Sequence, residues 1–236
     1  MFEGMSALTK VDLTKLRVGS STTNLNAMFR GCSSLQSVDL GTGQLTNASV
    51  LINSSNWNLT GVNNASYMFY GCNNLTDVRM ANFSVDVQMA NLSYMFSECE
   101  KINNILLRNV GTGMYANLTY MFNKTYREAN RSAYQYNSGN NLSLTNVGTG
   151  ESANLSHMFE DSTYLRNVSI LNNVGSGVSA NLSYMFYNCS SLIFVGADRP
   201  AENFGSGQNA NLQYAFSNIM TSSAYTPATY SITPIY

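Results

Sequence analysis

The sequence predicts a solenoid, in which short structural units stack side by side along one axis. One six-residue motif, called the phrase below and clearest at residues 91–96 (NLSYMF), recurs along the whole chain. The Met before each Phe recurs at steps of 27, 40, 27, 26, 37, 27 and 30 residues, with Ala215 replacing Met in the last copy. Repeats of roughly 20–50 residues are typical of solenoids, because one unit alone cannot bury its apolar side. We therefore expect about eight coils with a base unit of 26 or 27 residues, three of them enlarged by insertions.

The phrase itself predicts a short helical turn. Leu92, Met95, Phe96 and Cys99 fall at i, i+3, i+4 and i+7, which would place them on one face of a helix. Asn91 can accept hydrogen bonds from the first free backbone N–H groups of such a turn. The Phe side chains should consequently form one inward-facing row.

A short strand should follow each phrase. After residues 91–96, the apolar residues Ile102, Ile105 and Leu107 end in an alternation of period two, as in a strand. The equivalent positions elsewhere are Leu8, Val11 and Leu13; Leu35, Val38 and Leu40; Leu75, Val78 and Met80; Leu142 and Leu144; Leu165, Val168 and Ile170; and Leu192 and Val195. The predicted fold class is α/β: a single repeat solenoid over residues 1–220, with a parallel β-sheet on one face and short helices on the other. We expect residues 221–236 to form a non-repeat extended tail.

Two stretches carry a family resemblance, residues 67–75 (YMFYGCNNL) and residues 184–192 (YMFYNCSSL). With the Asn-x-Ser-Tyr that precedes the Met, they resemble the BspA-like leucine-rich repeat of microbial surface proteins. The resemblance covers residues 1 to about 220 and implies a leucine-rich-repeat solenoid, with adhesion and partner binding at the cell surface. The chain departs from that pattern in its Gly-rich return turns, its insertions and the loss of Cys from half of the units.

The composition excludes several classes of partner. Charged residues make up 11% of the 236 residues and the net charge is −1, against roughly 25% charged residues in ordinary globular proteins. A nucleic-acid-binding protein needs a basic face, and an anionic membrane surface requires the same. No stretch of 18 or more apolar residues is present, so we expect no membrane span. We also expect no cofactor and no enzymatic activity.

The four cysteines occupy the same slot of their units: Cys32, Cys72, Cys99 and Cys189. One interpretation is a row of small buried side chains. The other is a disulfide between adjacent coils, Cys72–Cys99 or Cys32–Cys72, because strands lie about 4.8 Å apart and disulfides join Cα atoms roughly 4.4–6.8 Å apart. No unit supplies a second ligand near the Cys, so a metal site is not predicted.

Two motifs that suggest chemistry have simpler explanations. Residues 148–153 fit the dinucleotide fingerprint G-x-G-x-x-A, but the pattern recurs at residues 111–116, 175–180 and 205–210, which indicates a return turn in each coil. His157, the single His, replaces the Tyr of the phrase, and with no Ser or Cys paired to it as a nucleophile and no second His it is expected to be a surface or groove residue, not a catalyst. The carboxylates are scattered and form no convincing pair of the glycosidase type.

The chain holds 15 N-x-[ST] sequons. Those inside the phrase are explained by capping, whereas the others are candidate sites for solubilising N-linked glycans. Candidates in the insertions are Asn47, Asn53, Asn58, Asn123, Asn130 and Asn141, and the further candidates are Asn74, Asn82, Asn167 and Asn188.

The expected function is non-enzymatic: an extracellular structural protein, N-glycosylated, that forms a subunit or segment of a surface fibre. The chain opens within a phrase at Met1 and Phe2, so we expect an open coil on which another copy stacks head to tail. Further self-assembly candidates in the tail are Tyr225, Tyr230 and Tyr236. The alternative is a cell-surface adhesin that binds a host protein or glycan. The only Trp, Trp57, lies in the polar insertion and is either a binding anchor or a residue that packs back on the coil.

Overall fold

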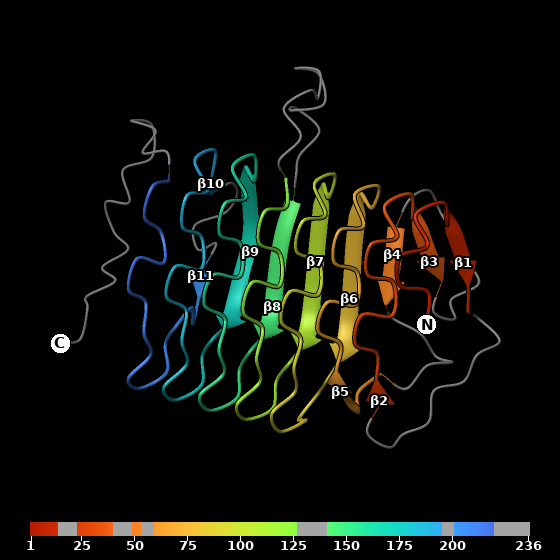
Figure 1. Ribbon diagram of the computed structural model, residues 1–236. Helices are drawn as coiled ribbons and strands as arrows, with labels where there is room; N and C mark the ends of the chain where they lie inside the picture. Colours follow the sequence, from red (N-terminus) through yellow and green to blue (C-terminus); the bar gives the residue numbers. More distant parts are fainter. Residues whose placement is uncertain (14–22, 40–48, 53–58, 127–140, 195–200, 220–236) are drawn as a thin grey trace.

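The computed structural model is a parallel β-solenoid, with strands on one side and irregular turns on the other (Figure 1). It describes residues 1–13, 23–39, 49–52, 59–126, 141–194 and 201–219. Successive coils follow one another along the axis in chain order, from β1 near the N-terminal end to β10 (Figure 1). The solenoid predicted from the repeats is confirmed.

All strand pairs between coils are parallel. The large sheet has the order β1-β3-β4-β6-β7-β8-β9-β10, with β11 also on β9, and a second ladder joins β2 to β5. The strands are β1 (Lys10–Asp12), β2 (Thr23–Asn24), β3 (Ser37–Asp39), β4 (Ser49–Ile52), β5 (Val62–Asn64), β6 (Asp77–Phe83), β7 (Asn104–Val110), β8 (Asn141–Val147), β9 (Asn167–Val174), β10 (Ile193–Phe194) and β11 (Ala201–Glu202).

The core lies between the large sheet and the turns, and a row of stacked Phe rings runs through it. Consecutive rings are 5.1–5.4 Å apart between centroids and nearly parallel. The row consists of Phe2, Phe29, Phe69, Phe96, Phe122, Phe159, Phe186 and Phe216. The prediction of one inward-facing Phe row is therefore confirmed, and the six interior rings are fully buried.

The prediction of short helices is wrong for the part of the chain that the structure describes, which contains no helix. The phrase forms consecutive tight turns instead, with Tyr67 at φ 58° and Gly71 at φ 69°. The Tyr70 N–H donates to the Tyr67 carbonyl within the turn, whereas the Phe69 N–H donates to Met95 of the next coil. Because the left-handed residues redirect alternate N–H groups along the solenoid axis, the i→i−4 bonds of a helix cannot form.

The prediction of eight equivalent coils, each with one strand, is too regular. β4 belongs to the insertion that follows the second phrase, yet it pairs with β3 on one side and β6 on the other. On the turn side the insertion adds no extra turn between the second and third units, as shown by Phe29, which stacks directly on Phe69 at 5.2 Å. The insertion thus adds a strand to the sheet without adding a ring to the Phe row, and the number of coils differs between the two sides.

The inward position predicted for Ile170 is also wrong. Val168 and Leu171 are buried, whereas Ile170 is 46% exposed. The register between β8 and β9 shifts after Leu142, so that Ser143 pairs with Ile170 and Leu144 with Leu171. A bulge adds one residue and moves the following side chain to the opposite face of the sheet.

Removing a ring from the middle of the Phe row should destabilise the protein more than removing a ring from its end. Phe96→Ala should lower the free energy of unfolding by about 3–5 kcal/mol, because it removes a fully buried ring with a stacked neighbour on each side. Phe216→Ala, at the end of the row and only partly buried, should lower it by less than half as much. Urea denaturation followed by circular dichroism measures both. Equal losses of unfolding free energy in the two variants would contradict a Phe row that runs through the core.

Candidate functional site

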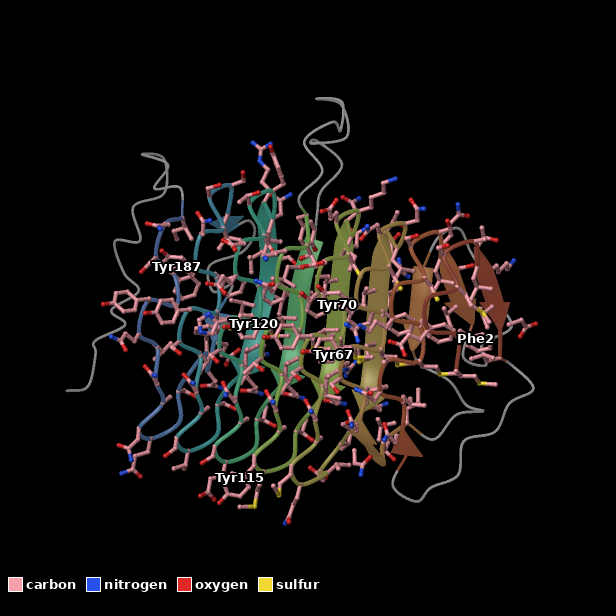
Figure 2. The ribbon with its side chains drawn as sticks, viewed as in Figure 1. Phe2, Tyr67, Tyr70, Tyr115, Tyr120 and Tyr187 are labelled. Carbon is pink, nitrogen blue, oxygen red and sulfur yellow. The ribbon has the colours of Figure 1, made fainter. Side chains whose placement is uncertain are left out.

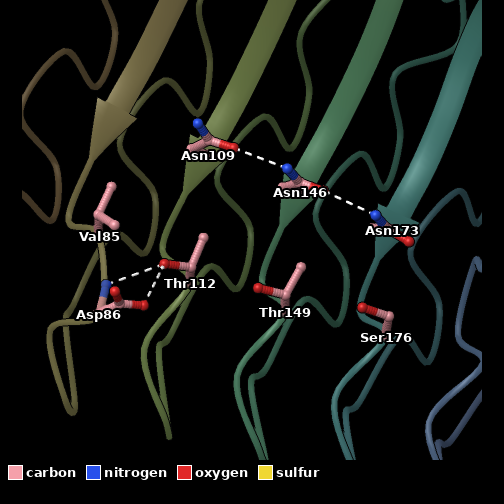
Figure 3. A pocket seen from close by; sticks show the side chains of 8 residues that line it. All are labelled: Val85, Asp86, Asn109, Thr112, Asn146, Thr149, Asn173 and Ser176. Atoms are coloured by element: carbon pink, nitrogen blue, oxygen red, sulfur yellow. Dashed lines mark hydrogen bonds between the residues drawn. The ribbon is translucent and has the colours of Figure 1, made fainter.

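A polar groove crosses the ends of β6 to β9, where each strand gives way to its return turn (Figure 3). It has a volume of ≈ 480 Å³ and is lined by Val85, Asp86, Asn109, Thr112, Asn146, Thr149, Asn173 and Ser176. One wall carries the amides of Asn109, Asn146 and Asn173. The other carries the hydroxyls of Thr112, Thr149 and Ser176, with the Asp86 carboxylate beside Thr112 (Figure 3). The groove is therefore built from the same two positions of successive coils.

The amide wall is a continuous hydrogen-bonded row, in which each Asn Nδ2 donates to the Oδ1 of the preceding Asn. The N···O distances are 2.8–2.9 Å. The row consists of Asn82, Asn109, Asn146, Asn173 and Asn203, all with φ between 51° and 55°. Asn tolerates the left-handed region better than other non-Gly residues, so the same residue both turns the chain and joins the coils.

The hydroxyl wall lies at the tips of the Gly-x-Gly return turns. Gly111 has φ 59°, and a Cβ on Gly113 would lie 2.1 Å from the Val87 carbonyl oxygen. These glycines are thus required by the turn, as the recurrence of the motif predicts. The residue between them, Thr112, accepts from the Asp86 N–H at 3.0 Å and donates to Asp86 Oδ1 at 3.2 Å.

A second row, of aromatic rings, lies on the turn side of the solenoid, in front of the sheet (Figure 2). Centroid distances are 4.7–5.0 Å. The row consists of Tyr67, Tyr94, Tyr120, His157, Tyr184 and Tyr214, and each has a positive φ. Because interior rings cover one another's faces, the row offers solvent only ring edges and polar atoms, which gives no platform for a flat ligand.

His157 therefore takes the place of a Tyr in the aromatic row. It stacks on Tyr120 at 4.7 Å and on Tyr184 at 4.9 Å, and its Nδ1 is 3.1 Å from Glu160 Oε2. Beside the same row, burial and the neighbouring Glu98 raise the pKa of Tyr70 to about 12. Both residues have structural partners, and among the described residues no group of His, Cys, Asp and Glu could hold a metal ion.

The four cysteines are buried free thiols, so the disulfides Cys72–Cys99 and Cys32–Cys72 are not observed. Each sulfur lies 3.0–3.2 Å from the carbonyl oxygen of a Phe of the preceding unit. Ser162 fills the same slot and donates to the Phe122 carbonyl at 3.0 Å. In interior coils the slot thus holds a small side chain with a donor, which explains why Ser can replace Cys there.

The sequon candidates occupy different environments. Asn123 is only 7% exposed and its Nδ2 donates to the Glu160 carbonyl, so it is not a site for a glycan. Asn188 Nδ2 donates to Asp161 Oδ1 at 2.8 Å. Asn74 Oδ1 accepts from Lys101 Nζ at 2.9 Å and Asn82 Oδ1 accepts from the amide row. Asn167 is half-buried at the start of β9, and Asn141 begins β8.

Several predicted site residues lie outside the described residues: Asn47, Asn53, Asn58, Asn130, Trp57, Tyr225, Tyr230 and Tyr236. Met1 and Phe2 are among the described residues, and Phe2 lies at the N-terminal end of the stack (Figure 2). Sequence reasoning missed the amide row and the hydroxyl wall. Their signal is the recurring Asn-Val-Gly-Thr/Ser-Gly, as at residues 109–113, 146–150 and 173–177.

The thiols should be unreactive in the folded chain. Burial raises the pKa of all four cysteines, which lowers the fraction present as the nucleophilic thiolate. At neutral pH, Ellman's reagent should find no reactive thiol in the native protein and four in unreduced, denatured protein. Two missing thiols in the denatured sample would instead indicate a disulfide.

No helix among the described residues is long and apolar enough to cross a lipid bilayer. No curated protein and no solved structure matches the chain. Three overlapping segments, residues 1–85, 42–144 and 87–202, match one protein family, described as "Mycoplasma protein of unknown function, DUF285". The matched segments run through most of the 236 residues. The chain therefore belongs to this family, DUF285.

Proposed function

We propose that the chain is a non-enzymatic extracellular structural protein, whose solenoid of about eight coils is a rigid segment of a surface fibre. The observation that carries the proposal is that the two ends of the described stack are complementary. Placement at the cell surface rests on the resemblance to BspA-like leucine-rich-repeat proteins. Glycans on exposed sequons would supply the polar surface that the few charges do not.

The complementarity begins in the backbone. At each interior junction on the turn side, the second left-handed residue of one coil donates to a carbonyl of the next coil, as Asn188 N–H does to Ser217 at 3.0 Å. Within the described residues, the equivalent N–H of Asn218 at one end and the equivalent carbonyl of Glu3 at the other make no backbone hydrogen bond. A second copy stacked head to tail brings these two groups together.

The side chains at the N-terminal end favour the same contact. Met1 is 83% exposed and Met5 49% exposed, although Met5 occupies the slot that buried Cys fills in interior coils. Phe2 stacks on Phe29 and ends the Phe row. A head-to-tail contact of this kind does not close on itself, so it produces filaments rather than rings.

The 236-residue chain should therefore form concentration-dependent linear assemblies, visible by light scattering and by negative-stain electron microscopy. Met5→Glu places a charge in the proposed junction and should leave the protein monomeric with an unchanged circular dichroism spectrum. Met89→Glu is the matched control, because Met89 is also exposed but lies in a return turn of an interior coil. It should assemble as the wild type does.

Wild-type protein that stays monomeric at high concentration would overturn the proposal. Equal effects of Met5→Glu and Met89→Glu would show that association occurs through surfaces other than the ends.

A further inference from the structure

We propose that the polar groove at the ends of β6 to β9 binds a neutral polysaccharide chain, which lies along the solenoid axis. This inference goes beyond a structural role and does not depend on end-to-end assembly. The groove would be the binding surface of the adhesin that the sequence suggests as the alternative function.

The amide wall keeps half of its hydrogen-bonding capacity for a ligand. A primary amide has two N–H donors and two acceptor lone pairs. Within the row, Asn146 uses one N–H toward Asn109 and one lone pair toward Asn173. The remaining donor and acceptor of Asn109, Asn146 and Asn173 are available in the groove (Figure 3). A sugar hydroxyl, which both donates and accepts, suits such a pair.

Two hydroxyls of the opposite wall are not used by the fold, unlike that of Thr112, which bonds Asp86, and that of Ser206, which donates to the Asn203 carbonyl. The return turn depends on its two glycines, whereas the residue between them is unconstrained by that packing. Thr149 and Ser176 nevertheless both carry a hydroxyl, and in the described part of the chain neither hydroxyl has a protein partner. Both face the groove opposite the amides (Figure 3). A ligand that hydrogen-bonds in the groove would account for the hydroxyls of Thr149 and Ser176.

The charge and the repetition of the groove identify the class of ligand. Asp86 is the one ionisable side chain in the lining, so the groove has no cation for an anionic polymer. Three coils present the same residue types: Asn109 with Thr112, Asn146 with Thr149, and Asn173 with Ser176. The Thr112 hydroxyl is already bonded to Asp86, so the two pairs that follow it are the open ones. Strands repeat at about 4.8 Å, so the groove offers one polar pair per step to a polymer of identical uncharged units.

The test uses the intact chain and immobilised glycans, with neutral polysaccharides (an α-glucan, a β-glucan, a mannan and a galactan) beside two polyanions (a polyuronate and a sulfated glycan). Binding to at least one neutral polymer and to neither polyanion is expected. A hexasaccharide of the bound polymer is then titrated by calorimetry into wild type and variants.

The variant Thr149→Val/Ser176→Ala removes two hydroxyls with little change of shape. It should weaken hexasaccharide binding by about tenfold or more, because two hydrogen bonds are lost. The matched control is Thr145→Val, a hydroxyl deletion on β8 outside the groove. It should change the affinity by less than about twofold, since about 0.4 kcal/mol corresponds to that factor.

The inference is overturned if no neutral glycan binds, if the groove variant and the control bind equally, or if an extended peptide library binds in place of glycans. Assembly of the wild type and of Met5→Glu is measured separately on the same preparations. Glycan binding by a wild-type chain that forms no fibres would refute only the proposed structural role. Wild-type fibres without glycan binding would refute only the groove.

Discussion

Backbone hydrogen bonds between successive coils are the constraint on which the rest of the structure depends. They hold parallel coils in register at the spacing of strands, about 4.8 Å, so the nearest neighbour of most side chains is its own counterpart in the next coil. Residues that pack well against themselves are therefore favoured. Phe stacks on Phe, Asn amides join in a row, and a small donor bonds the preceding carbonyl. Like charges would repel in such rows, which explains why only 11% of the residues are charged.

The register also explains the strained positions of the turns. A bulky residue with a positive φ is uncommon and stores of order 1–3 kcal/mol, yet Tyr94 and Tyr120 adopt φ 56°. Their rings stack at 4.8 Å on the outer side of the turns, and the Tyr94 N–H reaches the Thr119 carbonyl of the next coil. The conformation persists because it aims both the ring and the N–H at the neighbouring coil. Turn geometry, stacking and coil spacing thus support one another.

The sequence predicts the buried side of the fold better than its local geometry. Spacing alone identifies Leu92, Met95, Phe96 and Cys99 as one inward side, and all four are fully buried. It does not distinguish a helix from successive tight turns, because both return the same residues to the core.

β4 and the bulge at Ile170 could not be predicted, since each depends on pairing with strands of other coils. The groove was missed for a similar reason: each coil contributes only one amide and one hydroxyl, and the site exists only when coils are stacked. The recurring Asn-Val-Gly-Thr/Ser-Gly carries the signal, but no single copy indicates a binding surface. Chemistry that is distributed one pair per coil is visible in a repeat sequence only after the register is known.

The most direct test of the in-register stack is an NMR measurement on the folded chain. We expect contacts between the ring protons of Phe69 and Phe96 and between those of Phe96 and Phe122, together with chemical shifts that indicate a positive φ at Tyr67, Tyr94 and Tyr120. Sequential helical amide–amide contacts through residues 91–96, with no contact between Phe rings of successive units, would contradict the account.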